Sequence, residues 1–146
     1  MPQMHGINGM DLDPDNAAPT AVFFDITEKI ISCAFTVINT LGSGFLEKVY
    51  ENALAIELSH MKLQVVQQKP IEIRYREILI GEYVADLLVE DKVLVELKAV
   101  QGLEDIHYAQ CLNYLKATGF KVCLLLNFGK PELQVRRISA RKEWSK

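Results

Sequence analysis

The feature that most constrains the fold is an almost unbroken apolar run from Phe120 to Asn127. A run that does not alternate between polar and apolar side chains is typical of a β-strand buried on both faces. Such a strand needs a covering layer on each side, because its apolar side chains would otherwise remain in water. The run therefore predicts a central sheet covered by helices.

Length and composition set the class of protein. The chain has 146 residues, of which 49% are hydrophobic and 24% charged, as expected for one globular domain. No apolar run reaches the roughly 18 residues that cross a bilayer, so we expect a cytoplasmic protein with no membrane partner. The three cysteines, Cys33, Cys111 and Cys123, lack C-x-x-C spacing and are expected to be buried, reduced thiols.

Periodicity and breaker residues predict the order of the elements. Residues 1–22 combine glycines, prolines and three aspartates without an apolar period, so we expect them to be disordered. A domain over 23–140 and a basic tail over 141–146 follow. The predicted helices span 26–41, 46–60 and 104–117; the predicted strands span 65–75 with an interruption near Pro70, 78–90, 92–100, 120–127 and 133–138.

The predicted helices have expected boundaries and apolar faces. Asp25 or Thr27 is expected to cap the first helix, and Gly119 to end the last one. The expected apolar arc of the second helix consists of Leu46, Val49, Tyr50, Ala53 and Leu54.

The basic residues concentrate at the C-terminal end. Residues 130–146 contain six basic and two acidic side chains, a local charge of +4, whereas the rest of the chain carries −7. A basic end of this kind favours contact with phosphates, because their neutralisation releases counterions. A solvated charged tail explains it equally well.

Charged residues interrupt two strands that are otherwise apolar. Alternation places Asp86 on one face of its strand with Val84 and Leu88, opposite Ala85, Leu87 and Val89. On the next strand Glu96 and Lys98 share a face.

The length of the connecting turn decides whether these charges meet. A three-residue loop over 90–92 pairs Val89 with Val93 and places Asp86 opposite Glu96, whereas a two-residue loop places Leu97 there. The absence of glycine counts against the three-residue loop. We still expect it, because the other register leaves a charged residue facing a leucine.

Two facing carboxylates repel each other and require a positive partner. Lys98 alone provides one in a purely structural ion pair. A hard cation such as Mg²⁺ is the alternative, because it binds one or two carboxylates together with waters and substrate phosphate. An aspartate, a glutamate and a lysine around such an ion suit phosphodiester hydrolysis.

The spacing of Asp86 and Glu96-x-Lys98 resembles the PD-(D/E)XK nuclease superfamily, with Ala85 in place of the proline. The segment from Gly44 to Tyr50 resembles the signature of the GxxExxY protein family, a branch of that superfamily. The resemblance covers about residues 26–139. It implies an α/β, restriction-endonuclease-like core with a mixed central sheet flanked by helices.

The resemblance also implies roles for individual residues. Asp86, Glu96 and the main-chain carbonyl of Leu97 would bind Mg²⁺, Lys98 would assist water attack, and Glu47 would be a further metal or water ligand. Gln110 and Tyr114 resemble the Q-x-x-x-Y element of RecB-like nucleases, which lies near the substrate. A surface role for Glu47 remains the alternative, as does an ordinary helix that turns Ile106, Ala109, Leu112 and Leu115 inward.

These observations lead to one hypothesis and one rival, with a purely structural subunit as a third possibility. We expect a metal-dependent nuclease that uses Mg²⁺, with Mn²⁺ as a substitute, on nucleic acid, DNA in preference to RNA. An enzyme that acts on both strands of a duplex is expected to be a homodimer. The rival is a non-catalytic nucleic-acid-binding or protein-binding regulatory module that retains the nuclease fold. The sequence has no phosphate-binding loop motif and no zinc-ligand spacing.

Overall fold

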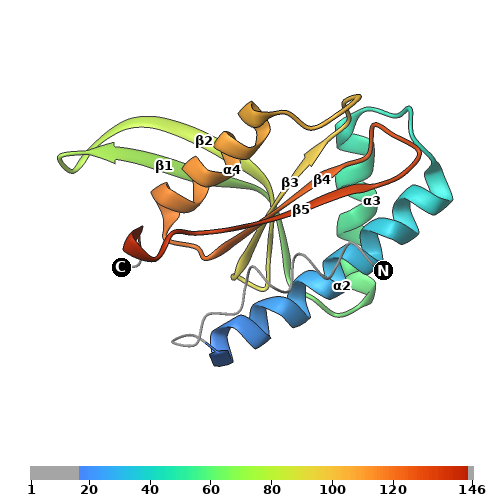
Figure 1. Ribbon diagram of the computed structural model, residues 1–146, viewed down its shortest axis with the longest axis horizontal. Helices are drawn as coiled ribbons and strands as arrows, with labels where there is room; N and C mark the ends of the chain where they lie inside the picture. The colour runs from blue at the N-terminus through green and yellow to red at the C-terminus, as the bar shows by residue number, and fades with distance from the viewer. Residues whose placement is uncertain (1–16, 145–146) are drawn as a thin grey trace.

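A computed structural model describes residues 17–144, with side chains from residue 21 onward. Figure 1 shows the helices arranged around one sheet. The elements are α2 (Ala17–Leu41), α3 (Glu47–His60), β1 (Val65–Tyr75), β2 (Ile78–Val89), β3 (Val93–Lys98), α4 (Asp105–Thr118), β4 (Val122–Asn127), β5 (Gln134–Ser139) and the 3₁₀ turn η2 (Lys142–Trp144).

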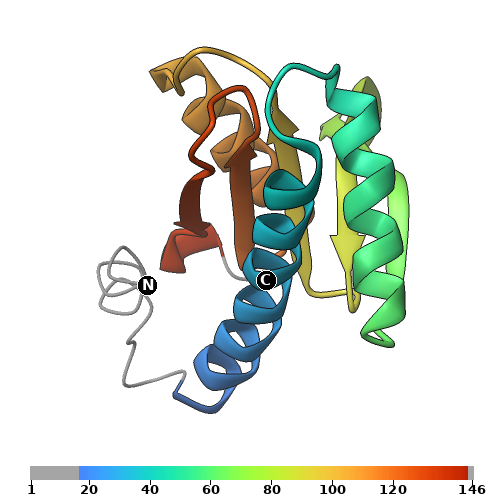
Figure 2. The same cartoon turned by 90° about the vertical axis from the view of Figure 1, so that its right-hand side faces the viewer.

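The sheet is mixed and has its strands in the order β1-β2-β3-β4-β5. Strands β3 and β4 are parallel and joined through α4, while the other neighbours are antiparallel. Helices α2 and α3 cover one face and α4 covers the other, as Figure 2 shows from the side. The predicted α/β architecture with a covered central sheet is confirmed.

Strand β4 is the centre of the core. All six of its residues are buried, as the apolar run predicts. Leu124 and Leu126 pack toward α2 and α3, whereas Cys123 and Leu125 pack toward α4. The three cysteines are free and buried, which confirms the prediction for their thiols.

Helix α2 begins earlier than predicted. It starts at Ala17, inside the segment expected to be disordered, and the remainder of that segment, 1–16, lies outside the described residues. Asp25 and Thr27 therefore lie within the helix, and neither caps it. Thr27 is fully buried. Its hydroxyl is satisfied there, since it donates to the Phe24 carbonyl (3.0 Å) and contacts the Arg137 guanidinium.

Helix α3 has its predicted bounds within one residue, but its buried face is rotated. Leu46 is 81% exposed and Val49 is also exposed, so the expected apolar arc is wrong at its first two positions. Tyr50 and Leu54 are buried as predicted. Glu51, absent from the expected arc, is 3% exposed, and its carboxylate is bound by two neighbouring amide groups and by the ammonium group of Lys48 (3.1 Å).

Strand β1 runs through Pro70 without a break. The proline is tolerated because β1 is an edge strand of the sheet. The β1–β2 pair is a long hairpin whose turn, Arg76 and Glu77, has two positive φ angles (50° and 68°).

The expected alternation of faces along β2 fails at Asp86. Leu87 and Val89 pack toward α2 and α3, but Ala85 packs toward α4. Across the pair, Gln68 lies opposite Asp86 and has a left-handed φ of 57°. The change of face on β2 thus coincides with a departure from extended geometry on β1.

The C-terminal segment packs against the domain. In the expected basic tail, Trp144 packs beside the core on the α4 side, where the Arg141 guanidinium lies 5.6 Å from its ring centre. Arg137 is buried inside the sheet, so it is not available to phosphates. None of the helices within residues 17–144 has the length and apolar character of a bilayer span.

A close approach of two backbones fixes the segment after β3. Asn127 bonds to both the amide and the carbonyl of Val100 (3.0 Å each), and the Phe128 amide donates to the Lys98 carbonyl (2.8 Å). A Cβ atom on Gly129 would lie 2.6 Å from the Ala99 carbonyl carbon and closer still to Val100. Only glycine therefore fits at this position.

Gly129→Ala is expected to lower the free energy of unfolding by about 1 to 3 kcal/mol or more, because the backbone of residues 99–100 must move. Chemical denaturation measures the change. Gly102→Ala is the matched control, since a Cβ there meets no atom within 4 Å. Equal stability of the two variants would contradict the prediction.

Candidate active site

The turn between β2 and β3 has the three-residue form that the sequence predicts. Val89 pairs with Val93, and Leu87 with Val95. Glu90 and Asp91 adopt left-handed φ angles of 55° and 54°, so two acidic residues take the conformation usually given to glycine.

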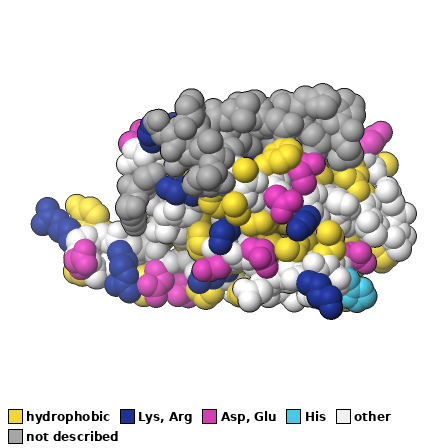
Figure 3. Space-filling model, turned by 90° about the horizontal axis from the view of Figure 1, so that it is seen from below, with side chains coloured by type: hydrophobic (Ala, Val, Ile, Leu, Met, Phe, Trp, Pro, Cys, Tyr) yellow, Lys and Arg dark blue, Asp and Glu magenta, His cyan; other side chains and the backbone are white. Residues whose placement is uncertain are grey.

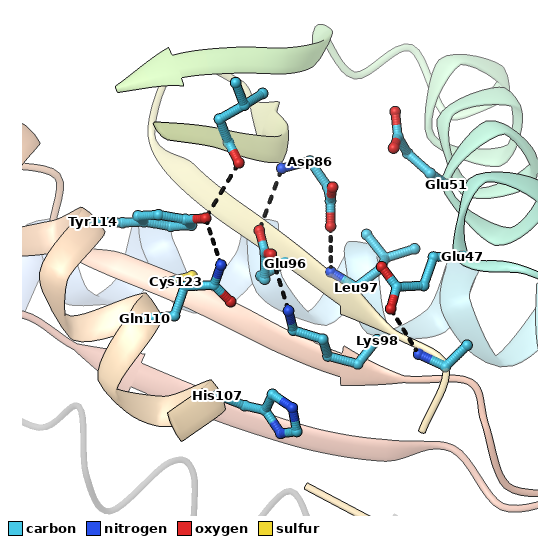
Figure 4. Close-up of polar contacts among 12 residues, drawn as sticks. Glu47, Glu51, Asp86, Glu96, Leu97, Lys98, His107, Gln110, Tyr114 and Cys123 are labelled. Carbon is cyan, nitrogen blue, oxygen red and sulfur yellow. Dashed lines mark hydrogen bonds and ion pairs between the residues drawn. The ribbon is translucent and has the colours of Figure 1, made fainter. Parts of the chain in front are cut away.

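Beyond the Leu87–Val95 pair, carboxylates occupy the gap between the two strands. Asp86 Oδ2 accepts a hydrogen bond from the Leu97 amide (2.8 Å), and Glu96 Oε1 accepts one from the Asp86 amide (3.4 Å). Figure 4 shows both groups where β2 and β3 separate. Each carboxylate is thus bound to the backbone of the opposite strand, and the predicted meeting of Asp86 with Glu96 is found.

The two carboxyl groups are costly to ionise at this position. Glu96 is 5% exposed, and burial together with the nearby Asp86 charge raises its pKa to about 8. Burial also raises the pKa of Asp86, against the stabilising amide of Leu97, and the charges of Glu51 and Glu47 raise it further. The site therefore has a deficit of positive charge.

One cation faces the pair from β3. Lys98 Nζ lies 3.5 Å from Glu96 Oε2, and the lysine side chain is mostly buried. Its charge lowers the pKa values of both Glu96 and Asp86, although burial outweighs it. The predicted convergence of one lysine on two carboxylates is present.

Helix α3 brings a third carboxylate to the end of β3. Glu47 is the first residue of the helix, and its Oε2 accepts a hydrogen bond from the Ala99 amide (3.4 Å). Figure 4 shows it beside Leu97 and Lys98. Glu47 is exposed, yet its carboxylate lies at the end of β3 beside the charged pair.

Tyr50 fixes the loop that precedes α3. Its hydroxyl donates to the Gly42 carbonyl (2.6 Å) and accepts from the Phe45 amide (3.1 Å), while its buried ring stacks on Phe128 at 4.8 Å. Gly44 has a φ of 116° in this loop, which a side chain would disfavour. Tyr50 thus belongs to the core, as expected, and helps set the start of the helix that carries Glu47.

Glu51 is a site residue that the sequence reasoning missed. It lies one turn after the first residue of α3, accepts hydrogen bonds from Gln67 (2.7 Å) and Gln68 (2.8 Å), and is the largest acidic contribution to the raised pKa of Asp86. The available signal was the i, i+4 spacing of two glutamates on one helix ahead of the charged strands.

Helix α4 turns its Q-x-x-x-Y face toward the sheet. Tyr114 is buried and donates to the Val84 carbonyl (3.2 Å), and Gln110 Nε2 donates to the Tyr114 hydroxyl (2.9 Å). Burial and the Glu96 charge raise the pKa of Tyr114. The alternative helix face is wrong at Ile106, which is 70% exposed, and at the exposed Ala109, whereas Leu112 and Leu115 pack inward as it expects.

A hollow of about 390 Å³ lies between β2, the end of β3 and α4. Its wall includes Lys98, Gln110 and Tyr114, together with His107, whose Nδ1 accepts from the Glu104 amide (2.9 Å) at the start of α4. Lys98 therefore borders a space that also contacts the predicted substrate residues.

The donor atoms at this site suit a hard divalent cation. Asp86, Glu96 and the Leu97 carbonyl offer oxygen, and a cation would relieve the burial penalty on both carboxylates. Among the described residues, no three His, Cys, Asp or Glu side chains converge to enclose a metal. Two carboxylates and one main-chain carbonyl are a small set of oxygen donors, and such a set suits a divalent ion that keeps several of its waters.

Comparison with known proteins gives a family and a fold. Residues 24–138, most of the chain, match the PD-(D/E)XK nuclease superfamily. An alkaline exonuclease, LHK-Exo from Laribacter hongkongensis, is similar in structure with a TM-score of 0.50 and 16% sequence identity. The similar region covers 66% of this chain and 57% of the exonuclease chain, which at this identity shows a shared fold alone. No curated protein matches the sequence.

The raised pKa of Glu96 predicts a pH-dependent stability in the absence of metal. Glu96 keeps its proton in the folded state up to about pH 8 but loses it near 4.5 when unfolded. Its contribution to the free energy of unfolding is therefore complete below about pH 4.5 and is lost as the pH rises through about 8. Thermal melts in EDTA across this range should show a smaller decline for Glu96→Gln than for the parent. Glu82→Gln, an exposed control, should follow the parent; identical declines in all three proteins would contradict the assignment.

The two hydrogen bonds of the Tyr50 hydroxyl, called here the Tyr50 clamp, predict that Tyr50→Phe lowers the free energy of unfolding. The Gly42 carbonyl and the Phe45 amide each lose a partner, which costs about 1 to 3 kcal/mol. Chemical denaturation provides the measurement, and Tyr75→Phe on the exposed end of β1 is the control. A Tyr50→Phe variant as stable as this control would show that the clamp contributes nothing.

Proposed function

The chain belongs to the PD-(D/E)XK nuclease superfamily, and we propose that it is a metal-dependent nuclease that hydrolyses phosphodiester bonds at Asp86, Glu96 and Lys98. The observation that carries this proposal is the reciprocal binding of Asp86 and Glu96 to each other's strand, with Lys98 ion-paired beside them. Three charged groups held at such a cost of desolvation suit a catalytic role better than a structural one.

We assign the metal ligands to Asp86, Glu96 and the main-chain carbonyl of Leu97, with Glu47 as a further ligand of the metal or of its water. Mg²⁺ is the proposed ion and Mn²⁺ its substitute, since both accept oxygen donors. When bound, a divalent ion stabilises charge on the phosphoryl oxygens and lowers the pKa of a coordinated water.

Lys98 has the role of orienting the attacking water or of adding positive charge to the phosphoryl group. Its side chain is largely buried and its ammonium is directed to Glu96, which limits the positions it adopts. In the reaction, the water oxygen bonds to phosphorus as the bond to one sugar oxygen breaks. The water gives up one proton and the departing sugar oxygen takes up one, so that the products are a phosphomonoester and a hydroxyl group. A lysine ammonium that is already held in one position stabilises the negative charge of this transition state, because little free energy is spent on reorienting it.

The substrate is proposed to lie along α4. Gln110 and Tyr114 line the hollow beside Lys98, which favours contact with the strand next to the cleaved bond. We propose nucleic acid, DNA in preference to RNA, and a symmetric pair of chains for action on both strands of a duplex. The buried free thiols are compatible with the proposed cytoplasmic location.

Within the superfamily, we propose that the chain belongs to the GxxExxY branch. The signature residues Gly44, Glu47 and Tyr50 each have a distinct place: a positive φ, a carboxylate at the end of β3, and a clamp on the preceding loop. This division of roles gives a physical reason for their spacing.

Asp86→Ala and Lys98→Ala are each expected to reduce cleavage by at least about 100-fold, because one removes a metal ligand and the other a preorganised positive charge. The assay compares single-stranded and double-stranded DNA and RNA in Mg²⁺, Mn²⁺ or EDTA. Glu72→Gln, on the exposed hairpin, is the control and should cleave like the parent. Metal-dependent cleavage that survives either alanine substitution would overturn the assignment.

Metal titration separates the enzyme from a regulatory module. Calorimetry should detect Mg²⁺ or Mn²⁺ binding to the parent and lose it in Asp86→Ala. Nucleic-acid or protein binding that ignores metal, without detectable metal binding, would instead indicate a non-catalytic module that retains the nuclease fold.

A further inference from the structure

The hollow beside Lys98 has a lining that suits more than a phosphate. Resting on the proposed nuclease function, we propose that this hollow receives an unpaired nucleobase adjacent to the cleaved phosphate and that the base stacks on Tyr83. The substrate at the moment of cleavage is then a single strand or an opened duplex end.

Tyr83 provides an aromatic surface at this position. It lies on β2, lines the hollow and is 56% exposed, whereas most aromatic rings of the core are buried. Its ring centre lies 6.4 Å from that of Tyr114, with 45° between the ring planes. Tyr114 is fixed by the Val84 carbonyl and by Gln110, so it supports the exposed ring from within. An exposed, supported ring favours stacking with the flat face of a base.

Polar groups in the same hollow suit the edge of a base. Asn113 lines the hollow, is exposed, and forms no side-chain hydrogen bond to another described residue. Its amide supplies both a donor and an acceptor, which a base edge requires. An apolar protein side chain in this space would desolvate Asn113 and Lys98 without giving either a partner, so a base fits the lining better.

The position of the hollow relates the base to the reaction. Lys98 is shared between the wall of the hollow and the ion pair with Glu96, so a phosphate at this lysine places its neighbouring nucleotide beside Tyr83. A base within a duplex has its faces covered by the neighbouring bases and its edge by its pairing partner. It must therefore leave the base stack before it can enter the hollow.

The net charge of the chain gives little support to a recognition mode based on electrostatic attraction alone. Figure 3 shows acidic and basic side chains mixed with hydrophobic ones across one face. The chain as a whole carries a formal charge of −3. Stacking next to the site therefore supplies affinity that the overall charge does not.

A binding experiment without cleavage tests this proposal. Short oligonucleotides containing 2-aminopurine are titrated with the full chain in EDTA, and again with Ca²⁺ to neutralise the carboxylates. Stacking on a tyrosine quenches the fluorescence of the probe, so the parent should quench single-stranded DNA or RNA more than the matching duplex. Tyr83→Ala is expected to bind about 5- to 100-fold more weakly and to lose the quenching, whereas Tyr83→Phe retains both.

Tyr75→Ala is the matched control, because Tyr75 is an exposed tyrosine on the same hairpin outside the hollow. Quenching lost in Tyr75→Ala but kept in Tyr83→Ala would overturn the proposal, as would a duplex that binds as well as the single strand. If Tyr83→Ala binds and cleaves like the parent while Lys98→Ala abolishes cleavage, the base site fails and the nuclease stands. If the parent quenches through Tyr83 but never cleaves, the nuclease fails and the base site stands.

Discussion

The separation of β2 from β3 is the constraint on which the site depends. The backbone ladder of these strands ends at Leu87 and Val95, and the next hydrogen bonds run from backbone amides to the carboxylates of Asp86 and Glu96. The strands supply the amides and the charged side chains together, so the geometry of the fold and the geometry of the site are set by the same bonds. Burial raises the pKa values of both acids, so it costs free energy to hold the two carboxylates in their charged forms at this position.

The helices complete the site from opposite faces of the sheet. Helix α3 brings Glu47 and Glu51 toward Asp86, and α4 brings Gln110 and Tyr114 toward Glu96. The buried β4 separates the two helical layers and packs with both. Strand β4, whose apolar run predicts the covered sheet, therefore also separates the α3 side of the site, which carries Glu47 and Glu51, from the α4 side, which carries the hollow.

Sequence reasoning reached the centre of the site because the three-residue turn fixes the register of β2 against β3. This register brings residues 86 and 96 near each other and needs no information from the rest of the chain. The same reasoning failed where tertiary contacts decide. Alternation does not foresee the left-handed Gln68 beside the change of face at Ala85, and periodicity does not foresee that two glutamine amides bury Glu51. The early start of α2 at Ala17 was hidden by neighbouring turn residues in the sequence.

Pro70 has a consequence for association between molecules. It lies on β1, the outer strand of the sheet, where unpaired amides invite another chain to extend the sheet. Proline has no amide hydrogen to offer, and the left-handed Gln68 two residues earlier interrupts the extended backbone. The hairpin edge therefore lacks one backbone donor and is not extended along its whole length, which makes it a poorer template for intermolecular β-pairing than an unbroken edge strand of the same length.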